Sequence, residues 1–510
     1  MAAGLNIGQL LGESLAGSQV LLYLEFHLRF RLSLVRIARI VVCRPGEADA
    51  PGLLVFAVPR QPPDRVVARP RSPAKCRGLL SDSYTLNNGL RLVVNPIPHT
   101  RAATIEVVVA AGFGYEGPDD HGLGHLVEHM LFKGTARRPG YREIAAAIES
   151  LGGVINAATD REVTAYYVRV PAEHLPAAAE LLGDVIGHST MAAAALAVEQ
   201  RIIVDELITA RDTPEDWVGQ LFDEMLWPDH GVGRRPSDGV PVIQAAIPEA
   251  LSAYLVHYYG AANMVVSVAG RVDAPAVRDV VESAFGGLAA GRSAQWPATP
   301  STGSKQRVAR DRQEGMQVNF VVGGRTFGHD DPDRFALDLL SAVLVEGMGS
   351  RLFAEIREER ALAYDIGGGL TQFRDTGSFA VGGAVAGAAL EPALETILAT
   401  CRSLADNDLP EPELRRARGY VKGGLILGME DSFNVASWFA REELLETERL
   451  TPEQAVERID AVTLADIRRV AKRIFAPGWA HLALVGPVSD ISGSYRVLER
   501  GSGVATNVAG

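Results

Sequence analysis

Apolar and polar residues alternate with two different periods along most of the chain, and these periods predict its elements. Residues 104–110 and 154–159 have the β-branched or alternating pattern of strands. Residues 141–151, 172–188 and 193–211 place apolar side chains at helical spacing. Strands and helices mixed in this order predict an α+β fold in which mostly antiparallel sheets are packed with helices.

The same order of elements occurs twice. Residues 248–270 and 464–486 share a helix, an aromatic residue, small residues, an apolar strand and a final glycine, at an offset of 216 positions without a gap. A fixed offset of this kind indicates two homologous repeats, each one an α+β unit. We expect an extension over 1–82, a first domain over 83–290, a linker rich in Ser, Pro, Thr and charge over 291–314, a second domain over 315–488 and a tail over 489–510.

The extension differs from the rest of the chain in composition. Residues 20–42 are apolar, but polar and charged side chains that lipid would not tolerate interrupt them, so we expect no transmembrane segment. These side chains are Glu25, His27, Arg29, Arg31, Arg36 and Arg39. Residues 1–12 also lack the basic residues of a secretory signal. Two alternatives stay open, a poorly ordered extension and an arginine-bearing amphipathic leader for an organelle or a membrane surface.

Charge and cysteine content narrow the classes of function. The 510 residues carry a formal net charge of −12, with +5 in the extension and −17 in the remainder. An acidic protein lacks the basic surface that displaces counterions from phosphates, so we expect no nucleic-acid binding, and cationic peptides are the more natural partners. The cysteines Cys43, Cys76 and Cys401 form no CxxC pair, so no disulfide framework follows and a reducing, cytoplasmic location is the default expectation.

One stretch carries the chemistry, the motif HLVEH at residues 125–129. If it is helical, His125, Glu128 and His129 stand at i, i+3 and i+4, which places two imidazoles and one carboxylate on a single face. Such a face holds a metal ion and a general base together. Shifting the motif by 216 positions gives residues 341–345, which contain no histidine or acid, so the second repeat has no metal site there.

A zinc peptidase needs three protein ligands and one open position, so a third ligand must come from another element. The predicted helix 193–211 offers Glu199 and Glu206, whose spacing of seven residues puts both carboxylates on one face. One of them could bind the metal while the other orients a ligand histidine. Asp205 points about 100° away from Glu206 and is the weaker candidate.

With these residues the chain resembles the inverzincin metallopeptidases of the pitrilysin type, in which HxxEH reverses the usual HExxH order. It is most similar to the mitochondrial processing peptidase and its bacterial relatives. The resemblance covers residues 84–488, about four fifths of the chain. Besides the motif and the two glutamates it rests on residues 129–135 and on Gly152-Gly153 with Asn156, Ala157, Thr159 and Glu162.

The resemblance implies a zinc endopeptidase that hydrolyses unfolded peptides or processing segments. His125, His129 and Glu206 would bind Zn2+, Glu128 would be the general base, and Glu199 would be a supporting acid near the site. Zinc lowers the pKa of its water toward about 7, and Glu128 takes a proton from that water and passes it to the leaving amine.

The resemblance also implies which residues bind the peptide substrate. Asn156 and Ala157 match a strand that pairs with the peptide as an added strand. In the second repeat Arg357 and Tyr364 match a pair that reaches across to the zinc site, where the tyrosine helps to stabilise the oxyanion. Ala361, between these two residues, replaces a usual glycine, and Phe113 stands where relatives often carry a polar or basic residue.

Relatives of this length pair their subunits, so the resemblance implies a homodimer or a heterodimer with a related subunit. Both the zinc ligands and the Arg–Tyr pair occur in this one chain, which favours a homodimer. The alternative function is a non-catalytic peptide-binding or structural subunit of the same fold, as some relatives in respiratory complexes have become. Such subunits tend to lose the ligands, whereas this chain keeps them.

Overall fold

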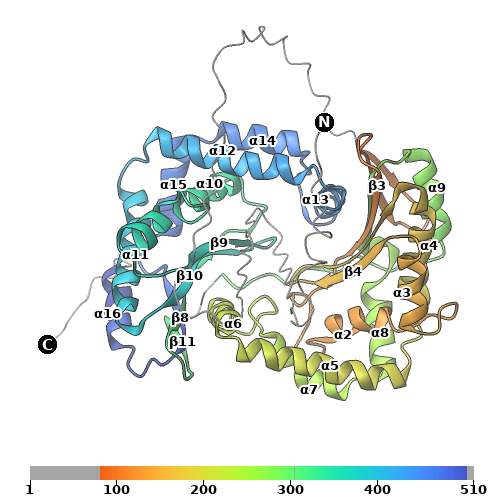
Figure 1. Cartoon of the computed structure of the whole chain (residues 1–510), viewed down its shortest axis with the longest axis horizontal. Helices are drawn as coiled ribbons and strands as arrows, with labels where there is room; N and C mark the ends of the chain where they lie inside the picture. The colour runs from red at the N-terminus through yellow and green to blue at the C-terminus, as the bar shows by residue number, and fades with distance from the viewer. Residues whose placement is uncertain (1–80, 302, 304, 502–510) are drawn as a thin grey trace, which may run out of the picture. The chain divides into compact units, whose positions relative to one another are not determined.

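A computed structural model describes residues 81–301, 303 and 305–501 of the chain (Figure 1). The extension expected over 1–82 lies outside the described residues except for its last two positions, and so do Cys43, Cys76 and the expected leader. None of the described helices is both long enough and apolar enough to span a membrane.

The first half of the described chain builds a six-stranded sheet in the order β1-β2-β6-β3-β5-β4. Its strands are β1 (Asp82–Thr85), β2 (Arg91–Pro96), β3 (Ala102–Val109), β4 (Val154–Thr159), β5 (Thr164–Pro171) and β6 (Met264–Gly270). β2 and β6 run parallel, and every other neighbouring pair runs antiparallel. β4 lies at one edge, so one side of its backbone is open to a further strand.

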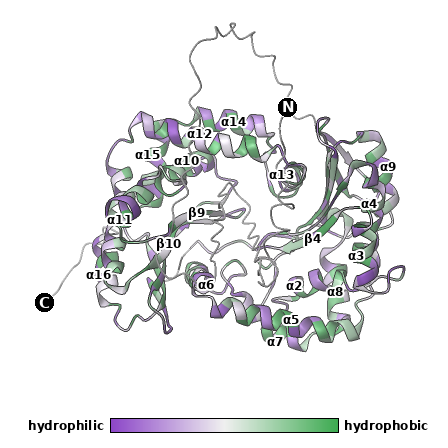
Figure 2. Cartoon of the chain, viewed as in Figure 1, coloured by the Kyte–Doolittle hydropathy of each residue, from purple (hydrophilic) through white to green (hydrophobic). Residues whose placement is uncertain are grey.

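Helices pack on one face of this sheet and share a core with it. They are α2 (Leu123–Leu131), α3 (Tyr141–Glu149), α4 (Leu175–His188), α5 (Ala193–Asp212), α7 (Val240–Ala245), α8 (Pro248–Tyr258) and α9 (Ala274–Phe285). The core includes Ile105 and Val107 of β3, Leu126 of α2 and Val185 of α4. In Figure 2 the helices carry both hydrophilic and hydrophobic residues, as burial of one side requires.

The second half builds a five-stranded sheet in the order β7-β11-β8-β10-β9. Its strands are β7 (Val308–Arg312), β8 (Val318–Thr326), β9 (Ile366–Gln372), β10 (Gly377–Val385) and β11 (His481–Gly486). Its helices are α10 (Arg334–Leu344), a π-helix (Phe353–Glu359), α11 (Leu390–Asp406), α12 (Glu411–Gly428), α14 (Pro452–Ala461), α15 (Leu464–Ile474) and α16 (Ser492–Gly501). β7 and β11 run parallel, and the remaining pairs run antiparallel.

The two halves have equivalent folds. The second sheet repeats the strand order of the first once β1 is set aside, with β7, β11, β8, β10 and β9 in the places of β2, β6, β3, β5 and β4. α8 shifted by 216 positions coincides with α15, and β3 begins 216 positions before β8. The predicted α+β fold with two repeats, each a mostly antiparallel sheet packed with helices, is confirmed.

Each half gives one helix to the other. α6 (Pro214–Leu226) belongs to the first half, yet its Trp217 and Phe222 share a core with Val485 of β11. α13 (Ser432–Leu445) belongs to the second half, yet its Phe439 shares a core with Val265 of β6. Both faces of the first sheet are therefore buried, which explains why β6 is buried along its whole length instead of alternating.

Two segments expected to be irregular contain regular structure. Strand β7 lies inside the predicted linker, and only its Val308 is buried, so this edge strand left little apolar pattern in the sequence. Earlier in the linker, the ring nitrogen of Trp296 donates a hydrogen bond to Asp375 at 3.0 Å. α16 lies inside the predicted tail and buries Val497 and Leu498. These segments are ordered by contacts with strands and helices far away in the sequence.

A buried charged cluster also connects the halves. His329 Nδ1 lies 3.2 Å from a carboxylate oxygen of Glu446, and its Nε2 lies 3.7 Å from Glu162 of the first half. Arg334 donates to the same oxygen of Glu446 at 2.5 Å, and Glu162 accepts a hydrogen bond from the backbone N–H of Arg374 at 2.8 Å. Burial lowers the pKa of His329, but the two carboxylates outweigh this effect and raise the pKa to about 9. His329 is therefore an imidazolium at neutral pH.

Candidate active site

The helix that carries the motif starts at a strongly constrained point. Gly122 precedes α2 at a φ of 90°, and the buried carboxylate of Glu116 accepts hydrogen bonds from the backbone N–H groups of Gly122 and Gly124 at 2.7 and 2.8 Å. A Cβ atom at Gly124 would lie 2.7 Å from the hydroxyl of Tyr254. His121, just before the helix, is buried, and its Nε2 lies 2.8 Å from the carbonyl oxygen of Arg235.

His125 and His129 project from the same face of α2, as the spacing predicted. Their ring centroids lie 4.8 Å apart, and the rings are nearly perpendicular. Glu206 comes from α5, and one of its carboxylate oxygens lies 3.9 Å from His125 Nε2. One ligand atom from each of these three residues lies within 4.8 Å of the other two. Asp205 is exposed on α5 and does not belong to this group.

The three side chains have the chemistry of a zinc site. Burial, followed by the neighbouring His129, lowers the pKa of His125 to about 4, so its imidazole is neutral and free to act as a ligand. Two imidazoles and one carboxylate are a usual donor set for catalytic zinc, which keeps a fourth position open. Phe113 closes one side of His125, with its ring edge-on at a centroid distance of 6.4 Å. The residues present fit the ion.

Glu199 contacts the ring nitrogen Nδ1 of His129 and so orients this imidazole. One oxygen of its buried carboxylate lies 3.0 Å from His129 Nδ1, so Nε2 is the ring nitrogen available to a metal ion. The other oxygen lies 2.9 Å from Nζ of Lys133, a residue to which the sequence assigned no role. A signal was present, since Lys133 follows His129 by four positions and such residues share a helix face.

Glu128 lies on α2 between the two histidines in sequence, and burial raises its pKa above the ordinary value. The hydroxyl of Thr159, at the end of β4, donates a hydrogen bond of 2.5 Å to one oxygen of Glu128. This contact opposes the effect of burial and fixes the carboxylate. Thr159 belonged to the pattern of the resemblance, but no role for it was predicted, because the residues are 31 positions apart.

The predicted substrate strand is the edge strand β4. Asn156 is exposed, and its side-chain oxygen accepts a hydrogen bond of 2.9 Å from the backbone N–H of Ala157. β4 pairs with β5 on its other side, where Asn156 faces Tyr167 and Ala157 faces Tyr166. The open side of β4 offers backbone groups to a peptide, as strand addition requires.

Arg357 and Tyr364, the pair predicted in the second repeat, lie together. The guanidinium of Arg357 stacks on the rings of Phe353 and Tyr364, at 4.9 and 5.1 Å from their centroids. The π-helix that contains Arg357 is followed by Ala361, whose φ of 50° is unusual for a residue with a side chain. In the described part of the chain, neither Arg357 nor Tyr364 forms a hydrogen bond or an ion pair with the α2–α5 cluster.

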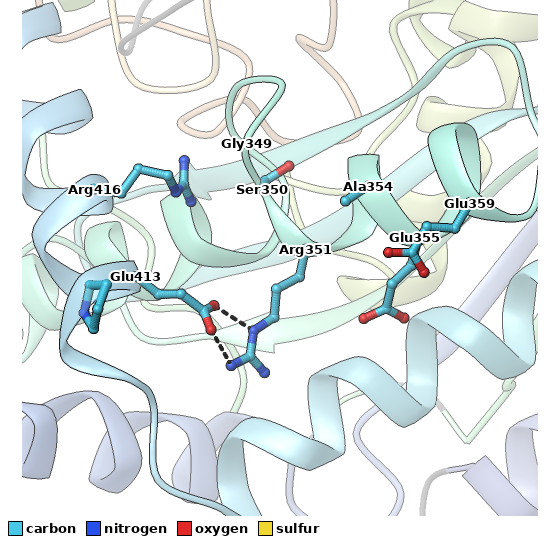
Figure 3. Close-up of a pocket in the computed structure, with 9 residues that line it drawn as sticks. Gly349, Ser350, Arg351, Ala354, Glu355, Glu359, Glu413 and Arg416 are labelled. Carbon is cyan, nitrogen blue, oxygen red and sulfur yellow. Dashed lines mark hydrogen bonds and ion pairs between the residues drawn. The ribbon is translucent and has the colours of Figure 1, made fainter.

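The segment before the π-helix lines a pocket of about 380 Å3. Figure 3 shows Arg351 and Glu413 at this pocket, joined by two hydrogen bonds of 2.7 and 3.1 Å. Arg416, also from α12, donates to the carbonyl oxygen of Ala342 at 2.7 Å. The Arg351–Glu413 bonds attach the segment before the π-helix to α12, and the Arg416 bond attaches α10 to the same helix.

Two family models match the chain. Residues 91–235 match the model described as insulinase, peptidase family M16, and residues 246–420 match the model described as peptidase M16 inactive domain. The first match contains His125, His129 and Glu206, and the second begins after all of them. The inactive description therefore applies to a part of the chain that holds none of the three residues.

Curated relatives match most of the chain. An uncharacterized zinc protease of Mycobacterium leprae is 34% identical over 424 residues, which cover 82% of this chain and 93% of that protein. An uncharacterized zinc protease of Bacillus subtilis is 30% identical over 408 residues, which cover 80% of this chain and 98% of that protein.

Solved structures match over a similar length. A protease from Helicobacter pylori has a TM-score of 0.72 and 23% identity and covers 80% of this chain and 99% of its own. A chain of complex III2 from Candida albicans has a TM-score of 0.71 and 17% identity and covers 82% of this chain and 99% of its own. At these identities the two structures show a shared fold alone.

Proposed function

Because this chain belongs to peptidase family M16, the insulinase family, we propose that it is a zinc-dependent endopeptidase that hydrolyses unfolded peptides or processing segments. One observation carries the proposal. His125, His129 and Glu206 place three ligand atoms within 4.8 Å of one another, and Glu128 lies on the same helix as the two histidines. This arrangement supports a metal-ligand set and a general base in one site.

The residues divide the chemical work among them. His125, His129 and Glu206 would hold zinc, which supplies the Lewis acidity that polarises a carbonyl and lowers the pKa of water to about 7. Glu128 takes a proton from the attacking water and delivers it to the leaving amine. Thr159 fixes the carboxylate of Glu128 with a hydrogen bond of 2.5 Å, and Glu199 orients His129.

Substrate binding by this proposal uses both repeats. The peptide adds as a strand to the open edge of β4 at Asn156 and Ala157, so backbone hydrogen bonds give affinity without strong sequence preference. Arg357 and Tyr364, held together in the second repeat, contact the peptide, and Tyr364 helps to stabilise the oxyanion. The proposal includes a dimer, either of two identical chains or with a related subunit, which native mass spectrometry would identify.

The rival function is a non-catalytic peptide-binding or structural subunit. The fold shared with a chain of complex III2 is the observation in its favour. A subunit of that kind has no need for the contact of the buried Glu199 with His129 or for the hydrogen bond from the Thr159 hydroxyl to Glu128, and both are present. The zinc peptidase therefore accounts for more of the site.

The test combines metal analysis with peptide cleavage. The purified chain is expected to hold one zinc ion and to cleave an unstructured peptide library, as read by mass spectrometry, and a chelator should stop the cleavage. Glu128→Gln should retain zinc and cleave at least about a hundredfold more slowly. Glu206→Gln should lose zinc, whereas its exposed neighbour Asp205→Asn, the matched control, should retain it. A chain without stoichiometric zinc, or a Glu128→Gln variant as fast as the parent, would refute the proposal.

A further inference from the structure

We infer that Lys133 is a positioning residue of the zinc site, acting through Glu199 on the ligand His129. The inference rests on the proposed function, since it assigns Lys133 a part in holding the metal. It adds a third layer to the site, in which a lysine holds the carboxylate that holds the histidine.

The contacts connect Lys133 to His129 through the carboxylate of Glu199. The side chain of Glu199 is only 4% exposed, and each of its oxygens has its own partner, His129 Nδ1 at 3.0 Å and Lys133 Nζ at 2.9 Å. Lys133 follows the end of α2, and its backbone N–H donates to the carbonyl oxygen of Met130 at 3.1 Å. This turn keeps Lys133 on the side of the helix from which His129 projects.

The chemistry explains why the lysine matters. A buried carboxylate is costly unless a positive charge and hydrogen bonds compensate it. In the described part of the chain, the side-chain nitrogen of Lys133 and the imidazole of His129 are the groups within ion-pair distance of Glu199. Without Lys133, one oxygen of Glu199 loses its partner, and the carboxylate lowers its free energy by turning toward water. His129 then loses the acceptor that fixes its ring.

Lys133 must act through Glu199 because its Nζ contacts that carboxylate and none of the three ligands. Partners that orient a metal-bound histidine are worth about 10- to 100-fold in metal affinity. Lys133 stands one step further from the metal, so the lower end of this range applies. We expect Lys133→Met to weaken zinc binding about tenfold.

The experiment measures zinc occupancy of the full chain against increasing concentrations of a chelator. Lys133→Met should release zinc at about one tenth of the chelator concentration that the parent needs. Lys133→Arg, which keeps the charge, should recover most of the affinity. Lys422→Met is the matched control, because the side chain of Lys422 on α12 is 26% exposed against 28% for Lys133 and pairs with Asp460 of α14 at 2.7 Å. It should bind zinc as the parent does.

Repeating the Lys133→Met substitution in a chain that already carries Glu199→Gln separates a positioning role from a general loss of structure. In a Glu199→Gln chain, Lys133→Met should cause no further loss of affinity, because the residue through which it acts is already changed. The visible spectrum of the Co2+-substituted protein should shift in Lys133→Met and should stay unchanged in Lys422→Met. Should Lys133→Met not fold, Lys133→Gln replaces it with the same expected loss.

The outcomes are distinguishable. Unchanged zinc affinity in Lys133→Met, or an equal loss in the parent and the Glu199→Gln chain, would overturn the role of Lys133 while leaving the zinc site intact. A parent chain that takes up no zinc would overturn the proposed function, and this inference with it.

Discussion

Raising the pH should weaken the connection between the two halves by discharging His329. The folded chain holds the pKa of His329 at about 9, because the carboxylates of Glu162 and Glu446 outweigh the cost of burial. An unfolded histidine has a pKa of about 6.5. The difference corresponds to roughly 3 kcal/mol of stability, at about 1.4 kcal/mol for each pH unit.

The sign follows from the direction of the shift. Because the folded pKa is above the unfolded one, this stability is fully present below pH 6.5 and is lost as the pH rises through about 9. His329→Gln removes the titrating group, so its free energy of unfolding should not fall with pH by this amount. The variant leaves Glu162 and Glu446 without the charge between them, so it should already be less stable at pH 6.5.

The assay is urea unfolding followed by circular dichroism at pH 6.5, 8, 9 and 10. The difference in unfolding free energy between the parent and His329→Gln should shrink by roughly 3 kcal/mol across this range. His99→Gln is the control, since the side chain of His99 is 68% exposed. A difference that stays constant from pH 6.5 to 10 would refute the assignment of His329 as a buried imidazolium.

Two further predictions concern the site and the strained turn. Thr159→Val removes the hydroxyl that lowers the pKa of Glu128, so the acidic limb of the pH profile of kcat/KM should move to higher pH. Thr159→Ser keeps a hydroxyl and should have the profile of the parent. A Thr159→Val profile equal to that of the parent would contradict this prediction. Ala361→Gly relieves a φ of 50° and should stabilise the chain by up to about 1 kcal/mol, read as a higher melting temperature. A lower melting temperature would show that Ala361 is not strained.

The parts of the site that the sequence predicted are those carried by local spacing. His125, Glu128 and His129 share a face because they stand at i, i+3 and i+4, and a helix of 20 residues presents Glu199 and Glu206 to them. The repeat of 216 positions likewise predicted two equivalent sheets. Helical spacing is visible in the sequence because each position is constrained by its near neighbours, and the repeat is visible because both units keep the same order of elements.

Contacts between distant residues left no such pattern. The sequence around Thr159 does not indicate that its hydroxyl donates a hydrogen bond to Glu128. The sequence around His329 does not indicate that two carboxylates, one from each half, lie next to its ring. The crossing of α6 and α13 was also not predicted, because an amphipathic helix does not state which sheet it will cover. Lys133 is different, since its spacing from His129 was visible but only the structure shows Glu199 between them.

The exchange of α6 and α13 has a consequence for how the chain is made. Glu106 of β3 meets Ser437 of α13 across 331 positions of sequence, so a ribosome adding about 5 to 20 residues per second delivers the second only about 15 to 65 s after the first. Throughout this interval the apolar strip along Val108 and Val265 has no helix to cover it. The half with the HLVEH motif is therefore incomplete when it leaves the ribosome, and its exposed apolar surface favours aggregation and chaperone binding. We expect this half to be unstable when it is expressed alone.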